Sequence, residues 1–115
     1  MRVAVVGAAG MLGKAVVQRF TDSGDEVGAY TRAQLDVTDG LAVRQAVEAT
    51  RPAWVINCAA QADVDHCENN VLEAYRINAL APWNLAAACR SVGAGLVQVS
   101  TDYVFDGTKV EPYIE

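Results

Sequence analysis

The chain has 115 residues, a formal net charge of −5 and 52% hydrophobic residues. Its length suits a single domain, and its composition excludes an intrinsically disordered chain. The acidic balance provides no basic face for nucleic acid and no polybasic anchor for a membrane surface. We therefore expect a folded domain with no nucleic-acid partner and no membrane partner.

The first apolar run, residues 3–6, ends at Gly7. It is too short for a signal peptide or a membrane-spanning helix. His66 is the only histidine, and its neighbour is Cys67. We expect no metal site, and a zinc site at this pair is the alternative. No C-x-x-C pair occurs, which indicates reduced thiols in a cytoplasmic protein. The three cysteines are Cys58, Cys67 and Cys89.

Short apolar runs alternate with longer amphipathic stretches along the chain. The runs at 3–6, 27–30, 54–56 and 96–99 predict buried strands. The first helix is expected over 11–20, because Leu12, Val16 and Phe20 recur at spacings of four. Gly24 is a plausible stop for this helix.

The second helix is expected to be capped by Thr38 or Asp39 and to end at Pro52. Its predicted apolar face consists of Val43, Ala46, Val47 and Thr50. A third helical stretch is expected to be capped by Asn69 or Asn70. Its later apolar face consists of Leu85, Cys89 and Val92. Residues 102–115 show no clear period.

The resulting order is β-α-β-α-β-α-β followed by a tail. Such alternation predicts a parallel sheet with helices on both faces and right-handed crossovers. The fold class is therefore α/β, a Rossmann-like doubly wound sheet with about four strands. A complete dinucleotide-binding fold usually has six strands in two halves, so residues 1–115 are expected to form a partial NAD(P)-binding domain.

A glycine-rich loop, Gly7-x-x-Gly10-x-x-Gly13, joins the first strand to the first helix. In such a loop Gly7 permits the tight turn, Gly10 lets the backbone approach a pyrophosphate, and Gly13 lets the helix pack on the sheet. The helix N-terminus adds free N–H groups and a positive dipole end. This arrangement predicts a dinucleotide site; the alternative is a glycine-rich connector in an unrelated α/β protein.

The end of the second strand indicates the type of cofactor. A carboxylate there would accept a hydrogen bond from the 2′-hydroxyl of the adenosine ribose, but the stretch reads Tyr30-Thr31-Arg32. Arg32 could pair with a 2′-phosphate, which favours NADP(H) over NAD(H). NAD(H), with a simply solvated Arg32, is the alternative.

Small residues follow the third strand in the stretch Asn57-Cys58-Ala59-Ala60. Ligands of open α/β sheets bind at the carboxyl edge of the strands. Here Cys58, Ala59 and Ala60 would let a ribose or nicotinamide lie against the backbone. Tight packing under a loop is the alternative.

Two stretches carry a specific resemblance: VINCAAQADVDHCE at 55–68 and VSTDYVFDG at 99–107. With the glycine loop, they make the whole chain resemble the dTDP-4-dehydrorhamnose reductase family of the extended short-chain dehydrogenase/reductase superfamily. Sugar-nucleotide epimerases and dehydratases of that superfamily usually show a Ser-Ser-x-x-Val-Tyr-Gly stretch instead. An epimerase or dehydratase relative is therefore a secondary alternative.

The resemblance implies NAD(P)H-dependent hydride transfer to C4 of dTDP-4-dehydro-L-rhamnose, giving dTDP-L-rhamnose. Thr101 matches the catalytic residue that hydrogen-bonds the substrate carbonyl, and Asp102 and Tyr103 match positions near the sugar. A dTDP-sugar is then the partner, and a homodimer is compatible with the family. The implied cofactor contacts are Gly10, Met11 and Leu12 for the pyrophosphate, Asp36 and Val37 for adenine, and Ala60, Gln61, Ala62 and Val99 for the nicotinamide side.

The sequence departs from the superfamily in one respect. The proton donor and its partner form a Tyr-x-x-x-Lys pair in the superfamily, and none of the tyrosines here is followed by lysine at that spacing. In the family this pair lies beyond the position where the chain stops. We therefore expect the 115-residue chain to be inactive alone. A non-catalytic dinucleotide-binding regulatory module is the alternative.

Two smaller features concern Pro82 and an acidic cluster. Pro82 has no N–H to donate to the carbonyl of Asn78. Asn78 matches a superfamily asparagine that helps hold a proton-relay water; alternatively, Pro82 simply starts a new helix. Asp63, Asp65 and Glu68 form an acidic cluster. We expect solvated loop and helix-start charges there, with a divalent cation as the alternative.

Overall fold

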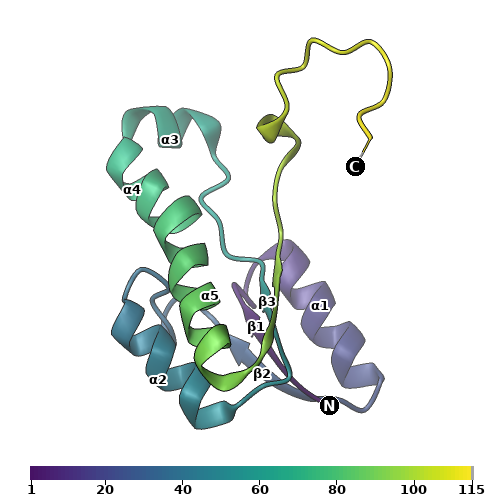
Figure 1. Ribbon diagram of the computed structural model, residues 1–115, viewed down its shortest axis with the longest axis vertical. Coiled ribbons are helices and arrows are strands. Elements are labelled where there is room, and N and C mark those ends of the chain that lie inside the picture. The colour runs from purple at the N-terminus through teal and green to yellow at the C-terminus, as the bar shows by residue number, and fades with distance from the viewer. Residues whose placement is uncertain (115) are drawn as a thin grey trace.

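The computed structural model describes residues 1–114. Four parallel strands form one sheet in the order β2-β1-β3-β4. Helix α1 covers one face, and helices α2 and α5 cover the other (Figure 1). The predicted α/β, Rossmann-like fold is confirmed. The strands are β1 (Arg2–Val6), β2 (Glu26–Tyr30), β3 (Trp54–Asn57) and β4 (Gly95–Gln98).

The helical segments agree with the predicted order and add detail between β3 and β4. Instead of one helix there, the chain forms several consecutive helical segments that end in α5. Because β4 ends at Gln98, Val99 lies just outside the strand, contrary to the prediction. The helices are α1 (Met11–Asp22), α2 (Gly40–Thr50), α3 (Val64–Asn69), α4 (Val71–Tyr75), the π-helical turn η1 (Arg76–Leu80), α5 (Ala81–Val92) and the 3-10 helix η2 (Asp102–Val104).

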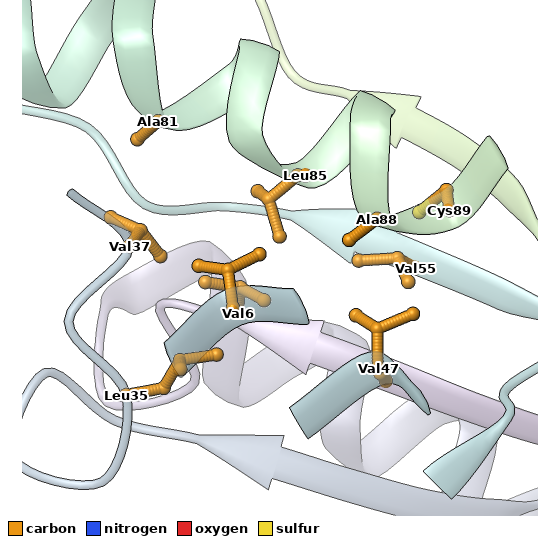
Figure 2. Close-up of a cluster of buried hydrophobic side chains, with 11 residues drawn as sticks. Val6, Leu35, Val37, Val47, Val55, Ala81, Leu85, Ala88 and Cys89 are labelled. Carbon is orange, nitrogen blue, oxygen red and sulfur yellow. The ribbon is translucent and has the colours of Figure 1, made fainter. Parts of the chain in front are cut away.

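The larger part of the core lies between the sheet and helices α2 and α5. Alternate residues of a strand point to opposite faces, so Val6 and Val55 point towards these helices. Figure 2 shows them among Val47 of α2 and Leu85 of α5. Leu85 is completely buried. The predicted faces of both helices are confirmed at these positions.

A smaller cluster lies under α1. It contains Val3 and Val5 of β1, and Val16 and Phe20 pack against it. Leu12, expected on the same face, is instead 45% exposed. Leu12 lies in the first turn of α1, next to Gly13, which packs on Gly7 and Ala8 of the loop rather than on the strands.

Side-chain caps fix two helix starts. Asp39, not Thr38, caps α2, since its Oδ1 accepts hydrogen bonds from the Leu41 and Ala42 N–H groups. Asp63 caps α3 by accepting from the N–H of His66. Of the two expected caps, Asn69 is instead the last residue of α3. Asn70 occupies the N-cap position of α4, but its side chain makes no capping hydrogen bond and donates to the His66 carbonyl.

The helix around Pro82 is continuous but locally widened. Pro82 lies in the first turn of α5, and η1 directly precedes that helix. The Ala81 N–H donates to the carbonyl of Arg76, five residues earlier. A proline cannot donate to the preceding turn, and a π-turn is one way for a helix to accommodate such a gap. Pro82 thus starts α5 without breaking the helical path.

No helix within residues 1–114 is both long enough and apolar enough to cross a lipid bilayer.

Leu85→Ala should strongly destabilise the fold, because it leaves a cavity between α5 and the sheet. We expect a loss of about 2–5 kcal/mol in the free energy of unfolding. Leu72→Ala is the matched control, since Leu72 is 77% exposed, and it should change stability by less than about 0.5 kcal/mol. Urea unfolding of the two variants measures both values. Similar midpoints would contradict the described core.

Candidate functional site

A cavity of about 960 Å³ opens at the carboxyl ends of β1 and β3. The strand order places β2 on one side of β1 and β3 on the other. Ligands of open α/β sheets bind at such a switch point. Nine of the predicted cofactor residues line this cavity: Gly7, Gly10, Arg32, Asp36, Val37, Cys58, Ala59, Ala60 and Gln61. Five others are not part of its lining: Met11, Leu12, Gly13, Ala62 and Val99.

Two glycines of the loop are required by packing. Gly7 has a φ of 76°, and a Cβ there would lie 2.6 Å from the backbone nitrogen of Ala59. A Cβ on Gly13 would collide with the carbonyl oxygen of Gly7. These contacts join the start of α1 to the segment after β3. No side chain larger than hydrogen fits at either position without a backbone shift.

Gly10 differs from these two glycines. Its φ is −71°, which any residue adopts. The nearest atom to an added Cβ would be the Gly7 carbonyl oxygen at 3.3 Å. Gly10 is also the N-cap of α1, and no side chain caps the helix. The first-turn N–H groups of α1 are therefore available to an anionic ligand, and Gly10 keeps the approach to them open.

Arg32 and Asp36 line the cavity beyond β2. Asp36 Oδ1 accepts hydrogen bonds from the Thr38 N–H at 2.9 Å and the Thr38 hydroxyl at 2.7 Å. These bonds, and to a smaller degree the charge of Arg32, lower the pKa of Asp36. From α5, Asn84 Nδ2 donates to the Val37 carbonyl at 3.1 Å. The segment is thus held in place by its own turn and by a helix.

The segment after β3 is held from both ends by asparagine side chains. Asn57 Oδ1 accepts from the Ala59 N–H at 3.1 Å. Asn78 on η1 forms two bonds to one residue: its Oδ1 accepts from the Gln61 N–H at 2.9 Å, and its Nδ2 donates to the Gln61 carbonyl at 3.0 Å. The cavity wall between these points is therefore backbone with small side chains, fixed before any ligand arrives.

His66 and Cys67, which were considered for a zinc site, have other partners. His66 pairs with Glu73 at 3.3 Å, and the Cys67 thiol donates to the Gln61 carbonyl. Burial raises the pKa of the Cys58 thiol. Such a thiol stays protonated near neutral pH and is a poor metal ligand. Within residues 1–114, no group of three or more His, Cys, Asp or Glu side chains is placed to hold a metal ion.

The residues predicted to contact substrate lie apart from the cavity. Thr101 Oγ1 accepts from the Tyr103 N–H at 3.2 Å and caps η2. Thr101, Asp102 and Tyr103 are all exposed, and none lines the cavity. Figure 1 shows this segment rising from the end of β4, away from the helices that flank the sheet.

Several residues that shape the cavity were not predicted as cofactor residues. Asn57, Asn78 and Asn84 act through side-chain bonds to backbone atoms. Of these, Asn78 was predicted only to help hold a proton-relay water. The wall formed by residues 69–73 and 76–77 was also missed. A polar residue directly after a buried strand, such as Asn57, is the one signal that could have indicated such a role. Asn84 gave no signal.

Gly13→Ala should destabilise the chain more than Gly10→Ala, because only the first substitution forces a Cβ into backbone atoms. We expect Gly13→Ala to lose about 1–3 kcal/mol of unfolding free energy and Gly10→Ala to lose clearly less. Urea titrations of both variants and the parent give the comparison. Equal losses would show that the loop geometry described for Gly13 is wrong.

Comparisons with known proteins agree with this geometry. The family described as the RmlD substrate binding domain matches residues 1–115. A dTDP-4-dehydrorhamnose reductase of Streptomyces griseus is 50% identical over 111 residues, which cover 96% of this chain and 36% of that protein. A dTDP-4-dehydrorhamnose reductase of Mycobacterium tuberculosis is 44% identical over 106 residues, 92% of this chain and 34% of that protein.

Solved structures give the same result. A dTDP-4-dehydrorhamnose reductase of Clostridium acetobutylicum superposes with a TM-score of 0.95 at 46% identity, covering 98% of this chain and 40% of that one. The dTDP-4-dehydrorhamnose reductase of Bacillus anthracis, solved in complex with NADP, superposes with a TM-score of 0.92 at 40% identity. The match covers 96% of this chain and 39% of that one. The chain thus spans about two-fifths or less of the length of these relatives. It belongs to the family described as the RmlD substrate binding domain.

Proposed function

We propose that this chain is the NAD(P)-binding portion of an NADPH-dependent dTDP-4-dehydrorhamnose reductase, which reduces dTDP-4-dehydro-L-rhamnose to dTDP-L-rhamnose. The family description names a substrate-binding domain, but the geometry of residues 1–114 favours a cofactor site. The observation that carries the proposal is Gly10, whose added Cβ would meet only the Gly7 carbonyl oxygen, at 3.3 Å, and which leaves the N-terminus of α1 without a side-chain cap.

The glycine loop and the cavity residues would take the parts of NADPH in order. Gly10, Met11 and Leu12 would contact the pyrophosphate at the start of α1, where the N–H groups of the first helical turn act as donors. Arg32 would pair with the 2′-phosphate, and Asp36 with the adenine beside it. The solved Bacillus anthracis relative, 40% identical, contains NADP, which supports this choice of cofactor over NADH.

The segment after β3 would hold the nicotinamide end. Its small side chains, from Cys58 to Ala62, allow the ring and its ribose to lie against a fixed backbone. NADPH supplies the hydride for reduction when it is bound. The orientation of the ring would come from Gln61, whose backbone is held by Asn78.

Thr101 would donate a hydrogen bond to the substrate carbonyl, with Asp102 and Tyr103 beside the sugar. General acid catalysis contributes about 10²–10⁴-fold, and the Tyr-x-x-x-Lys pair that would supply the proton is absent from this sequence. We accordingly assign cofactor binding to this chain and reduction to the complete reductase. The dTDP-sugar substrate and a cytoplasmic location belong to the same proposal.

A second candidate is a dinucleotide-binding module without catalysis, because residues 101–103 are not part of the cavity lining. Both candidates require NADPH to bind at the same loop. They differ in whether a chain extended to the length of the relatives reduces the sugar nucleotide.

Gly10→Val should abolish NADPH binding, because the valine side chain would occupy the approach to the first turn of α1. Isothermal titration calorimetry of the parent and the variant measures the dissociation constants. Ala15→Val is the matched control, since Ala15 is an exposed residue of the same helix outside the cavity. It should titrate like the parent. If Gly10→Val also titrates like the parent, the glycine loop is not the phosphate site.

Arg32→Ala should weaken NADPH binding by about tenfold or more while leaving NADH binding unchanged, since a hydrogen bond to a charged group contributes about 1.5–3 kcal/mol. Titrations with both cofactors measure the ratio. Arg90→Ala removes an equal charge from an exposed position on α5 and should leave the ratio unchanged. Equal losses for both cofactors, or no loss for either, would reject a 2′-phosphate contact.

A further inference from the structure

Three consecutive hydrogen bonds cross the sheet edge between the segment after β3 and the segment after β4. The Ala59 N–H donates to Asn57 Oδ1 at 3.1 Å. Asn57 Nδ2 donates to Gln98 Oε1 at 2.8 Å. Gln98 Nε2 then donates to the Val99 carbonyl at 2.7 Å. We call this the amide chain. It begins in the wall of the cavity and ends two residues before Thr101.

The direction of every bond in the amide chain follows from its first donor. A backbone N–H can only donate, so the oxygen of the Asn57 side chain must face Ala59. The nitrogen of the same amide then faces Gln98 and requires its oxygen. This leaves the Gln98 nitrogen for the Val99 carbonyl. Reversing either side-chain amide would place two donors or two acceptors against each other.

The burial of Asn57 shows that the amide chain is part of the sheet interior. Asn57 has no exposed surface, and it is the only buried polar or charged residue found within residues 1–114. It stands directly opposite Gln98 in the parallel register of β3 and β4. An apolar residue could fill the same space without hydrogen-bonding demands, whereas a buried amide lowers stability unless its partners are in place. Asn57 therefore fixes the hydrogen-bond geometry between β3 and β4 rather than adding apolar packing to the core.

Both ends of the amide chain reach segments that the proposed function uses. Ala59 lies against Gly7, where an added Cβ would come within 2.6 Å of the Ala59 nitrogen. A displacement of Ala59 would therefore disturb the glycine loop. At the other end, the Val99 N–H donates to the Asn57 carbonyl at 3.3 Å. Val99 is thus tied to Asn57 directly and through Gln98.

We propose that Asn57 and Gln98 are positioning residues that fix the segment carrying Thr101 relative to the nicotinamide side of the cofactor site. They would touch neither cofactor nor substrate. Their effect passes through the backbone of Ala59 and Val99. This inference rests on the proposed function for the identity of the ligand, but the hydrogen-bond coupling itself is a property of the free chain.

The first test measures amide hydrogen exchange in the ligand-free chain by NMR. Gln98 is exposed, so Gln98→Met should fold even if a substitution of buried Asn57 does not. We expect the Ala59 amide to exchange at least tenfold faster in Gln98→Met, while the amides of Val3 and Val5 keep the parent rates. Gln98→Glu keeps the acceptor for Asn57 and removes the donor to Val99, so Ala59 should remain protected.

Gln18→Met is the control, because Gln18 is an exposed glutamine that donates only to Asp22 on α1. It should leave the Ala59 rate unchanged. An unchanged Ala59 rate in Gln98→Met would overturn the coupling. So would an acceleration equal to that of Val3 and Val5, because it would indicate general loss of stability.

The second test adds NADPH to the same proteins and follows amide chemical shifts. In the parent we expect shifts at Gly7 and Gly13 and also at residues 100–103. In Gln98→Met the glycine-loop shifts should persist and those at 100–103 should fall by at least half. Unreduced shifts at 100–103 would overturn the positioning role. Absence of glycine-loop shifts in the parent would overturn the proposed function, and the hydrogen-exchange result would still decide the coupling.

Discussion

The contact between Gly7 and the backbone of Ala59 is the constraint on which the site depends. At Gly7 the chain turns with a positive φ and passes within contact distance of the segment after β3. The N–H groups of Gly7 and Ala8 both donate to the Tyr30 carbonyl at the end of β2. The carbonyl of Gly7 accepts from the Gly10 N–H and packs against Gly13. Three strand ends and the start of α1 therefore meet at one residue without a side chain.

The fold could be predicted largely from the sequence, because its signals are local. Apolar runs such as 3–6 and the periodic apolar residues of α2 and α5 follow from burial on a sheet, and parallel order follows from alternation. The errors occurred where a position is decided by its surroundings. Leu12 has the spacing of a core residue but lies beside the glycine loop. The stretch from Val64 to Leu80 divides into several segments, because Asn70 leaves the helical conformation between α3 and α4 and a π-turn precedes Pro82.

The candidate site could be predicted only in part, because its geometry depends on the surroundings of each residue as well as on local sequence. Glycines and small residues after strand ends are visible in the sequence, and many of those assigned to the cofactor line one cavity. The bonds that hold this cavity join residues far apart in the chain: Gln61 with Asn78, 17 residues later, and Val37 with Asn84, 47 residues later. No periodicity or composition rule marks an asparagine whose partner is a distant backbone group.

The charge of the protein gives a physical reason why the proposed cofactor site would rely on backbone groups. The chain carries a formal charge of −5, so its overall field repels a dinucleotide phosphate. Binding of such a ligand must therefore depend on short-range donors: the free N–H groups of α1 and the local charge of Arg32. Backbone N–H groups are effective only when held in position, because each hydrogen bond needs a narrow range of distance and angle. Neutral asparagine side chains provide that rigidity without adding charge beside the ligand. Rigid backbone with few charges is therefore an arrangement suited to the proposed binding of an anion by an acidic chain.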